Sequence, residues 1–151
     1  MTPLAIPKSV LEEARAFFEQ QGSQGCEGTA MICQSSGGAV RLVIPRQTAT
    51  PAPFCSVEVS EEGKLDLELA LASDELYISR IHSHPELAFH SPTDNANRII
   101  THEGALSIVV PFFGLALRRG LDACAVFRFD DHKWDELEPG RSRSLWVVEG
   151  S

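Results

Sequence analysis

One stretch, expected to form a strand, a helix and a second strand, constrains the fold of this chain most. Residues 76–81 are typical of a strand, and Pro85 ends it. Residues 91–94, Ser-Pro-Thr-Asp, combine an N-cap candidate, a proline at the first helical position and an acid in the first turn. We therefore expect a helix over residues 92–101, followed by a buried strand over residues 106–110.

The rest of the chain adds an amphipathic helix and several short strands. Residues 9–12 read as a capping box for a helix that runs to Gly22, and residues 46–54 as a loop. Residues 65–71 alternate with period two although their residue types favour helix, so that segment stays open between the two. Further strands are expected at residues 29–34, 39–44, 56–59, 123–129, 133–137 and, at an edge, 144–148. This mixture suggests an α+β fold or a three-layer α/β/α sandwich.

Length, composition and charge are those of one globular domain. The chain has 151 residues, of which 43% are hydrophobic and 23% charged, so we expect a single domain over residues 1–151. The formal net charge of −8 argues against a surface that binds nucleic-acid phosphates without sequence preference. No apolar stretch resembles a signal peptide or a membrane span. We therefore expect a cytoplasmic protein with neither a nucleic-acid nor a membrane partner.

The four cysteines, Cys26, Cys33, Cys55 and Cys124, show no Cys-x-x-Cys spacing. Because there is no secretory signal, we expect free and mostly buried thiols. A nucleophilic role for Cys26 would need an environment that a sequence does not show.

Two histidines and an aspartate indicate metal chemistry. His82 and His84 are two apart on an extended segment, so they project to the same side, where their rings can share one ion. Asp94, in the first turn of the next helix, can complete three protein ligands and leave a fourth position for water, as in catalytic zinc sites. Zinc held in this way lowers the pKa of its water to about 7.

Such a site also needs a base that takes the proton and passes it to a leaving amine. Glu27, just before the strand expected at residues 29–34, is the candidate, with Glu86 and Glu103 as alternatives. Taken alone, Glu27 would be interpreted as a solvated acid and the two histidines as packed, hydrogen-bonded side chains. The order of ligands, strand end, helix cap and acid in one short window favours the metal site.

In these residues the chain resembles the JAB/MPN metallopeptidase family, whose active members share the JAMM motif. That motif is a glutamate segment, then His-Ser/Thr-His-Pro, then Ser-x-x-Asp. Residues 82–85 and 91–94 match in full, whereas Ala30 and Gln34 stand where the family usually has glycines after the glutamate. Residues 104–114 extend the resemblance towards bacterial JAB proteins, which are often encoded beside ubiquitin-like modifiers and their conjugation enzymes, including in anti-phage operons.

The resemblance implies a cytidine-deaminase-like α/β/α sandwich with a mixed central sheet. It implies one zinc ion (Zn2+) held by His82, His84 and Asp94, with Glu27 as the base and Ser91 as the hydrogen-bond donor to the oxyanion. Ser91 could instead cap the following helix through its hydroxyl. The implied activity is that of an isopeptidase or peptidase that cleaves after the C-terminal tail of a ubiquitin-like protein, in conjugates or in precursors. The conjugation enzymes would be further partners.

Other functions compete with this interpretation. A nucleoside deaminase shares a similar scaffold, but its chemistry calls for His-x-Glu followed by Pro-Cys-x-x-Cys, and the chain has neither. A catalytically inactive MPN scaffold that binds a ubiquitin-like partner is disfavoured because all the motif residues are present. A peptidase that processes a sulfur-carrier protein stays open.

Overall fold

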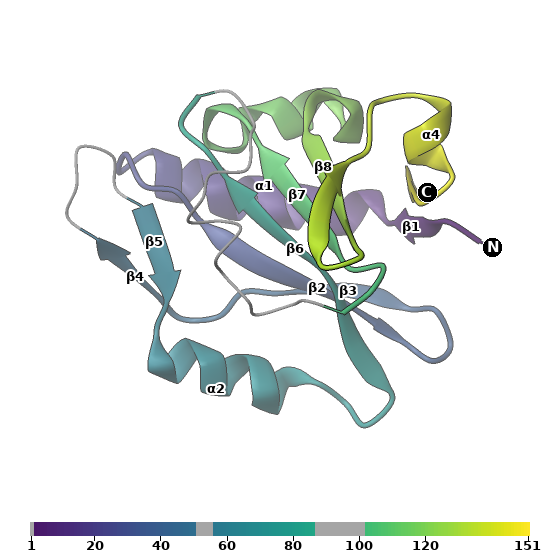
Figure 1. Ribbon diagram of the computed structural model, residues 1–151. Coiled ribbons are helices and arrows are strands. Elements are labelled where there is room, and N and C mark those ends of the chain that lie inside the picture. Colours follow the sequence, from purple (N-terminus) through teal and green to yellow (C-terminus); the bar gives the residue numbers. More distant parts are fainter. Residues whose placement is uncertain (1, 51–55, 87–101) are drawn as a thin grey trace.

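The computed structural model describes residues 2–50, 56–86 and 102–151, which form both helices and strands (Figure 1). The elements are β1 (Leu4–Ile6), α1 (Lys8–Gly22), β2 (Thr29–Ser35), β3 (Val40–Val43), β4 (Gln47–Thr50), β5 (Ser56–Val59), α2 (Glu61–Ala70), β6 (Glu75–Ser83), β7 (Leu106–Val110), the 3-10 helices η1 (Phe112–Arg119) and η2 (Leu121–Ala123), β8 (Ala125–Asp130), β9 (Lys133–Glu136), α4 (Arg141–Ser144) and β10 (Val147–Glu149).

A mixed sheet of six strands forms the middle of the molecule, in the order β3-β2-β6-β7-β8-β9. Within this sheet β6 and β7 pair in parallel, and the other neighbouring strands are antiparallel. The strand and buried-strand predictions at residues 76–81 and 106–110 are confirmed as the two central strands. Two small pairs, β1 with β10 and β4 with β5, lie outside this sheet.

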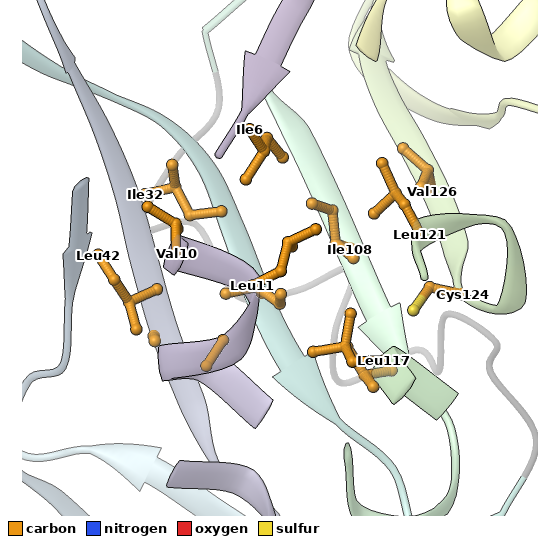
Figure 2. Packing of buried hydrophobic residues seen from close by; sticks show 14 of the residues in the cluster. Ile6, Val10, Leu11, Ile32, Leu42, Ile108, Leu117, Leu121, Cys124 and Val126 are labelled. Carbon is orange, nitrogen blue, oxygen red and sulfur yellow. The ribbon is translucent and has the colours of Figure 1, made fainter. Parts of the chain in front are cut away.

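One face of the sheet is apolar and is covered by α1 and η1 (Figure 2). We call it the helix face. Val10, Leu11 and Phe18 of α1 pack on it, as the helical spacing predicts. Its buried apolar strand residues are Ala30, Ile32, Leu42, Ile81, Leu106, Ile108, Val110 and Val126.

The other face carries polar groups among its apolar ones, and we call it the histidine face. Leu67 of α2 packs there in one cluster with Met31 and Cys33. Helices therefore lie on both sides of a mixed sheet, which confirms the α/β/α sandwich. The strand residues of this face, by register and alternation, are Thr29, Met31, Arg80, His82, Ser107, Val109, Ala125 and Phe127.

The first helix starts differently from the prediction. The capping box at residues 9–12 is wrong, because α1 begins at Lys8 and its N-cap, Pro7, makes no side-chain cap. The Pro7 carbonyl instead accepts the N–H groups of Val10 and Leu11, at 3.0 and 3.2 Å. The ring of Pro7 already holds φ at −58° for the entry into the helix.

For residues 46–71 and 144–148 the structure decides or changes what the sequence predicts. Residues 65–71, left open, belong largely to α2, whose N-cap Ser60 accepts a hydrogen bond from the Gly63 N–H. The expected loop at residues 46–54 is wrong for residues 47–50, which form β4 and pair with β5. The final strand pairs with β1 and not with the central sheet. The helix expected over residues 92–101 lies outside the described residues.

The cysteines divide into two kinds. Cys33 and Cys124 are free and buried, as predicted, and burial raises the pKa of the Cys124 thiol to about 12. Cys26 is disulfide-bonded, so the expectation of free thiols is wrong at that position. Cys55 lies outside the described residues. In the part of the chain that the structure describes, none of the helices has both the length and the apolar character that crossing a membrane requires.

Candidate metal centre

The carboxyl end of β6 presents the two histidines of the motif. His82 is the last but one residue of β6, and His84 follows the strand by one position. The backbone of His84 is held on both sides, because its N–H donates to the Val110 carbonyl at 2.9 Å and its carbonyl accepts the Phe113 N–H at 2.8 Å. The segment after the strand is thus tied to β7 and η1, although Pro85 ends the ladder.

The two imidazole rings converge. Their Nε2 atoms lie 3.2 Å apart, and both side chains are buried. The distance would also allow a hydrogen bond between the rings if one Nε2 carried a proton and the other did not. Two imidazole nitrogens on one tetrahedral zinc ion, each about 2.0–2.1 Å from it, would lie roughly 3.3 Å apart. The separation of the two nitrogens therefore matches that of two neighbouring ligands of such an ion.

Glu27 is brought to the same end of the sheet by the register of β2 on β6. Thr29 pairs with His82, and Gly28 continues the pairing with Ser83. The Gly28 N–H donates to Ser83 Oγ at 2.8 Å, and the Gly28 carbonyl accepts the Ser83 N–H at 3.0 Å. Extended one step further, beyond the ends of both strands, this register would set Glu27 opposite His84, on the histidine face.

The approach of these two segments needs a glycine. A Cβ at Gly28 would lie 2.9 Å from Cε2 of Phe17 and 3.0 Å from Cδ1 of Phe18. Only a residue without a side chain lets this segment pass α1 so closely while its backbone bonds to Ser83. Packing of α1 on the sheet thereby fixes the position of Glu27, whose side chain is half-buried.

The other expected site residues have different outcomes. Ser91 and Asp94 lie outside the described residues, so their placement stays a prediction. Among residues 2–50, 56–86 and 102–151 there is no cluster of three or more metal-binding side chains. Of the alternative bases, Glu86 is exposed and follows the histidines closely. Glu103 accepts the Asp131 N–H at 3.2 Å and lies before the amino end of β7, far along the strand from the residues paired with His82.

The sequence analysis missed a buried cation behind the histidines. Arg80 is only 4% exposed and lies two residues before His82, on the histidine face. Its Nε donates to Ser107 Oγ at 2.9 Å, and its guanidinium lies 5.2 Å from the ring centre of Trp134. An arginine at i−2 on a strand that ends in His-x-His was the available signal, because alternation places it on the face of the histidines.

Comparison with known proteins places these observations in a family. No protein-family model matches the chain. A curated relative, the probable metalloprotease y4jG of Sinorhizobium fredii, is 33% identical over 144 residues, which cover 89% of this chain and 86% of the relative.

Two solved structures share the fold. A JAB1/MPN domain protein from Archaeoglobus fulgidus has a TM-score of 0.53 at 15% identity, over 98% of this chain and 100% of its own. The protein DSY2949 from Desulfitobacterium hafniense has a TM-score of 0.57 at 17% identity, over 97% of this chain and 93% of its own. With this fold and a relative of that identity over most of both chains, the chain belongs to the MPN/JAMM family.

Proposed function

We propose that this protein is a JAMM-type zinc metallopeptidase that cleaves amide bonds after the C-terminal tail of a ubiquitin-like protein. The convergence of the His82 and His84 rings, 3.2 Å apart at Nε2, is the observation that carries the proposal. The relative named a probable metalloprotease supports peptidase chemistry in general. Conjugates and precursors are both candidate substrates, and a place in bacterial anti-phage defence is part of the proposal.

His82, His84 and Asp94 would hold the metal. The two histidines lie at the carboxyl end of a central strand, and the aspartate would come from the segment that follows Pro85. Two imidazoles and a carboxylate form a donor set that zinc accepts in peptidases. When bound there, zinc supplies Lewis-acid polarisation of the scissile carbonyl and makes a water-derived nucleophile available at neutral pH.

Glu27 would move the proton. Its carboxylate takes a proton from the attacking water as the C–O bond forms, and gives it to the amine nitrogen as the C–N bond breaks. The pairing of β2 with β6 supports this role, because it brings the backbone that precedes Thr29 to the end of the sheet where His82 and His84 lie. The hydroxyl of Ser91 would donate to the oxyanion that forms on the carbonyl.

The substrate would be recognised through a folded ubiquitin-like domain as well as its tail. Contacts with the globular part position the tail and raise turnover, so a peptide that spans only the tail junction is a poorer substrate. The conjugation enzymes of the same modifier are the further partners we propose.

The first test separates metal binding from proton transfer. We expect Glu27→Gln to retain one zinc per chain, measured by elemental analysis, and to lose about 10²–10⁴-fold in turnover. Glu86→Gln is the matched control, because Glu86 is an exposed acid of the same kind that directly follows the His82–Pro85 segment. Full activity in Glu27→Gln would refute the assignment of the base, and absence of stoichiometric zinc from the unmutated protein would refute the metal site.

The second test concerns the substrate. Cleavage rates are compared for a ubiquitin-like domain fused through its Gly-Gly tail to a reporter, for the same domain linked to a lysine side chain, and for a tail-junction peptide. Higher kcat/KM for either folded substrate than for the peptide supports the proposal, and the faster of the two distinguishes precursors from conjugates. Equal kcat/KM for all three would refute recognition of the folded domain while leaving the peptidase assignment intact.

A further inference from the structure

A cavity of about 550 Å³ lies on the helix face, towards the end of the sheet opposite the histidines. Small-molecule sites in proteins typically have volumes of about 300–1,000 Å³. Leu106, the first residue of β7, and Ile78, in the first half of β6, line the cavity, whereas His82 and His84 do not. Residues near both chain ends border it as well, where β1 pairs with β10 (Figure 1). The cavity is therefore separate from the candidate metal centre.

A β-bulge directs Ile78 to this face of the sheet. Ile32 pairs with Ser79 and Cys33 pairs with Tyr77, so Ile78 is the extra residue of β6 at this point. Tyr77 packs with the apolar cluster of the histidine face, whereas Ile78 packs with that of the helix face. Leu106 belongs to the same helix-face cluster. The apolar wall of the cavity is thus continuous with the main core, and it can bury the apolar part of a ligand.

An arginine that stacks on a tryptophan forms the polar side of the cavity. Arg128 of β8 pairs with Leu106 of β7, so its side chain lies on the same face of the sheet. Its guanidinium carbon lies 3.9 Å from the centre of the Trp146 ring, and its side chain is only 20% exposed. Its Nη2 atom lies 3.8 Å from where a Cβ at Gly104, another lining residue, would stand. Stacking therefore holds the planar guanidinium at the wall of the cavity.

The hydrogen-bonding capacity of Arg128 is unused in the described part of the chain. Its ion pair with Asp130 has a long N···O distance of 3.6 Å, and Asp130 is itself 54% exposed. None of the described residues accepts a hydrogen bond from the guanidinium. A guanidinium has five N–H donors in a geometry that binds a carboxylate through two parallel hydrogen bonds. Arg128 is therefore preorganised for an anionic ligand.

The charges around the cavity favour a ligand with a single negative charge. Arg128 is the one cationic side chain among the lining residues, all of which the structure describes, and Glu103 lines the cavity too. A phosphate dianion would meet one guanidinium and would be repelled by the carboxylates of Glu103 and Asp130. One guanidinium suffices for a carboxylate, and the wall of Ile78 and Leu106 suits an aliphatic body.

We propose that this cavity binds a monocarboxylate with an aliphatic body. The carboxylate pairs with Arg128, and the body lies against Ile78 and Leu106. A free short-chain acid and the C-terminal carboxylate of a peptide chain present this same chemistry. The site goes beyond the proposed peptidase function and does not depend on it.

The first test measures binding to the full chain of 151 residues by isothermal titration calorimetry. The ligands are acetate, butanoate and hexanoate, with hexanamide as the uncharged match of hexanoate and with inorganic phosphate. We expect hexanoate to bind about tenfold more tightly than hexanamide, because hydrogen bonds to charged groups are the stronger ones. Each added CH2 should tighten binding by about two- to fourfold. Equal affinities for acetate and hexanoate, or tighter binding of phosphate than of hexanoate, would overturn the proposal.

Substitutions of Arg128 test the pairing with the carboxylate. Arg128→Gln should reduce the preference for hexanoate over hexanamide to within about twofold. Arg128→Lys keeps the charge without the planar fork and should weaken hexanoate binding by about fivefold, so it carries the test if Arg128→Gln does not unfold cooperatively in urea. Arg119→Gln is the matched control, because Arg119 is an exposed arginine outside this cavity. An unchanged preference in both Arg128 variants would overturn the proposal.

A further pair of measurements distinguishes the cavity from the candidate metal centre, since zinc also binds carboxylates. His84→Ala should bind hexanoate as tightly as the unmutated protein, and loss of binding in this variant would assign the ligand to the metal centre. Trp134→Phe leaves Trp146 as the single tryptophan of the chain. Hexanoate should change the fluorescence of this variant, and unchanged emission at saturation would overturn the proposal.

The source of the ligand follows from two compounds that share an aliphatic body. N-acetyl-leucine represents the C-terminus of a peptide chain, and 4-methylpentanoate represents a free acid. Tighter binding of the first would support a peptide terminus as the ligand, and tighter binding of the second would support a free acid. Binding of neither compound would overturn the proposal, while the peptidase assignment would stand.

Discussion

The two faces of the central sheet are built from the same strands and differ in what they bury. On the helix face, Ile81 and Ile108 are fully buried in one large apolar cluster. On the histidine face, their chain neighbours Arg80, His82 and Ser107 are buried polar groups. Apolar burial stabilises a fold, whereas a buried polar group costs free energy unless it is hydrogen-bonded. The helix face is therefore mainly apolar, with only the small hydroxyls of Ser79 and Ser83 buried beside Ile81 among these strand residues, whereas the histidine face buries an arginine and an imidazole.

The largest expected effect is the loss of turnover caused by a substitution on the histidine face. His84→Ala should lose stoichiometric zinc and at least about 10³-fold in turnover, because a bound metal supplies several kcal/mol of transition-state stabilisation. The metal-free variant should still unfold in a cooperative transition, so that the loss of zinc and turnover is distinguished from loss of the fold. Elemental analysis, turnover and urea unfolding in the presence of a chelator check this. A variant that keeps one zinc per chain would contradict it.

A substitution on the helix face should do the reverse. Ile108→Ala removes a fully buried side chain from the apolar cluster and should lower the unfolding free energy by about 2–5 kcal/mol. Zinc content and turnover of the folded fraction should stay the same. Leu69→Ala, at a residue that is 74% exposed on α2, serves as control and should cost less than about 0.5 kcal/mol. Equal urea midpoints for the two variants would show that the helix face does not dominate stability.

Two fully buried serines show how much the hydrogen bond to the buried Arg80 contributes to the unfolding free energy. Ser107→Ala removes an oxygen that accepts the Arg80 Nε–H, so it should cost about 1.5–3 kcal/mol, the range for hydrogen bonds to charged groups. Ser79→Ala, on the adjacent strand, removes only a hydroxyl that donates to the Arg80 carbonyl and should cost about 0.5–1.5 kcal/mol. Urea unfolding measures both. A larger loss of unfolding free energy in Ser79→Ala than in Ser107→Ala would contradict this prediction.

The smallest effect lies at the opposite end of β6 from the histidines. Arg41 donates twice to the Glu75 carboxylate, at 2.7 and 2.8 Å, and holds the pKa of Glu75 down at about 2. Because the folded pKa is lowered, this pair stabilises the fold above pH 4.5 and the stabilisation is lost as the pH falls towards 2.

The contribution of this pair should be small, since Arg41 is 46% exposed and solvent screens it. The urea midpoints of the unmutated protein and of Glu75→Gln should differ at pH 7, and the difference should shrink below pH 4.5 and vanish only as the pH falls through about 2. A gap that widened with acidification would show that the sign is wrong.

Residues near the motif could be predicted because their signals are local. The buried strand at residues 106–110 matches β7 at both ends, and Pro85 ends the preceding strand where proline removes a donor from the ladder. The secondary structure of residues 65–71 could not be predicted, because their period-two alternation favours a strand whereas their residue types favour a helix. It became a helix once the Ser60 cap and the acids of its first turn stabilised the helix start.

The sequence alone determines which residue types are available for the chemistry of this protein and in what order they follow along the chain. Periodicity, caps and prolines act over a few residues, so elements such as β7 and the extended His82–His84 segment follow from local physics. The tertiary structure determines which of those residues come into contact. The contact of the Glu27 segment with the histidine segment joins Gly28 and Ser83, 55 residues apart, and depends on helix α1 packing against a glycine. No local sequence pattern predicts the left-handed backbone of Phe112, which has a φ of 57°. Its free-energy cost is offset by tertiary hydrogen bonds, which the Phe112 and Phe113 N–H groups donate to the Glu86 and His84 carbonyls.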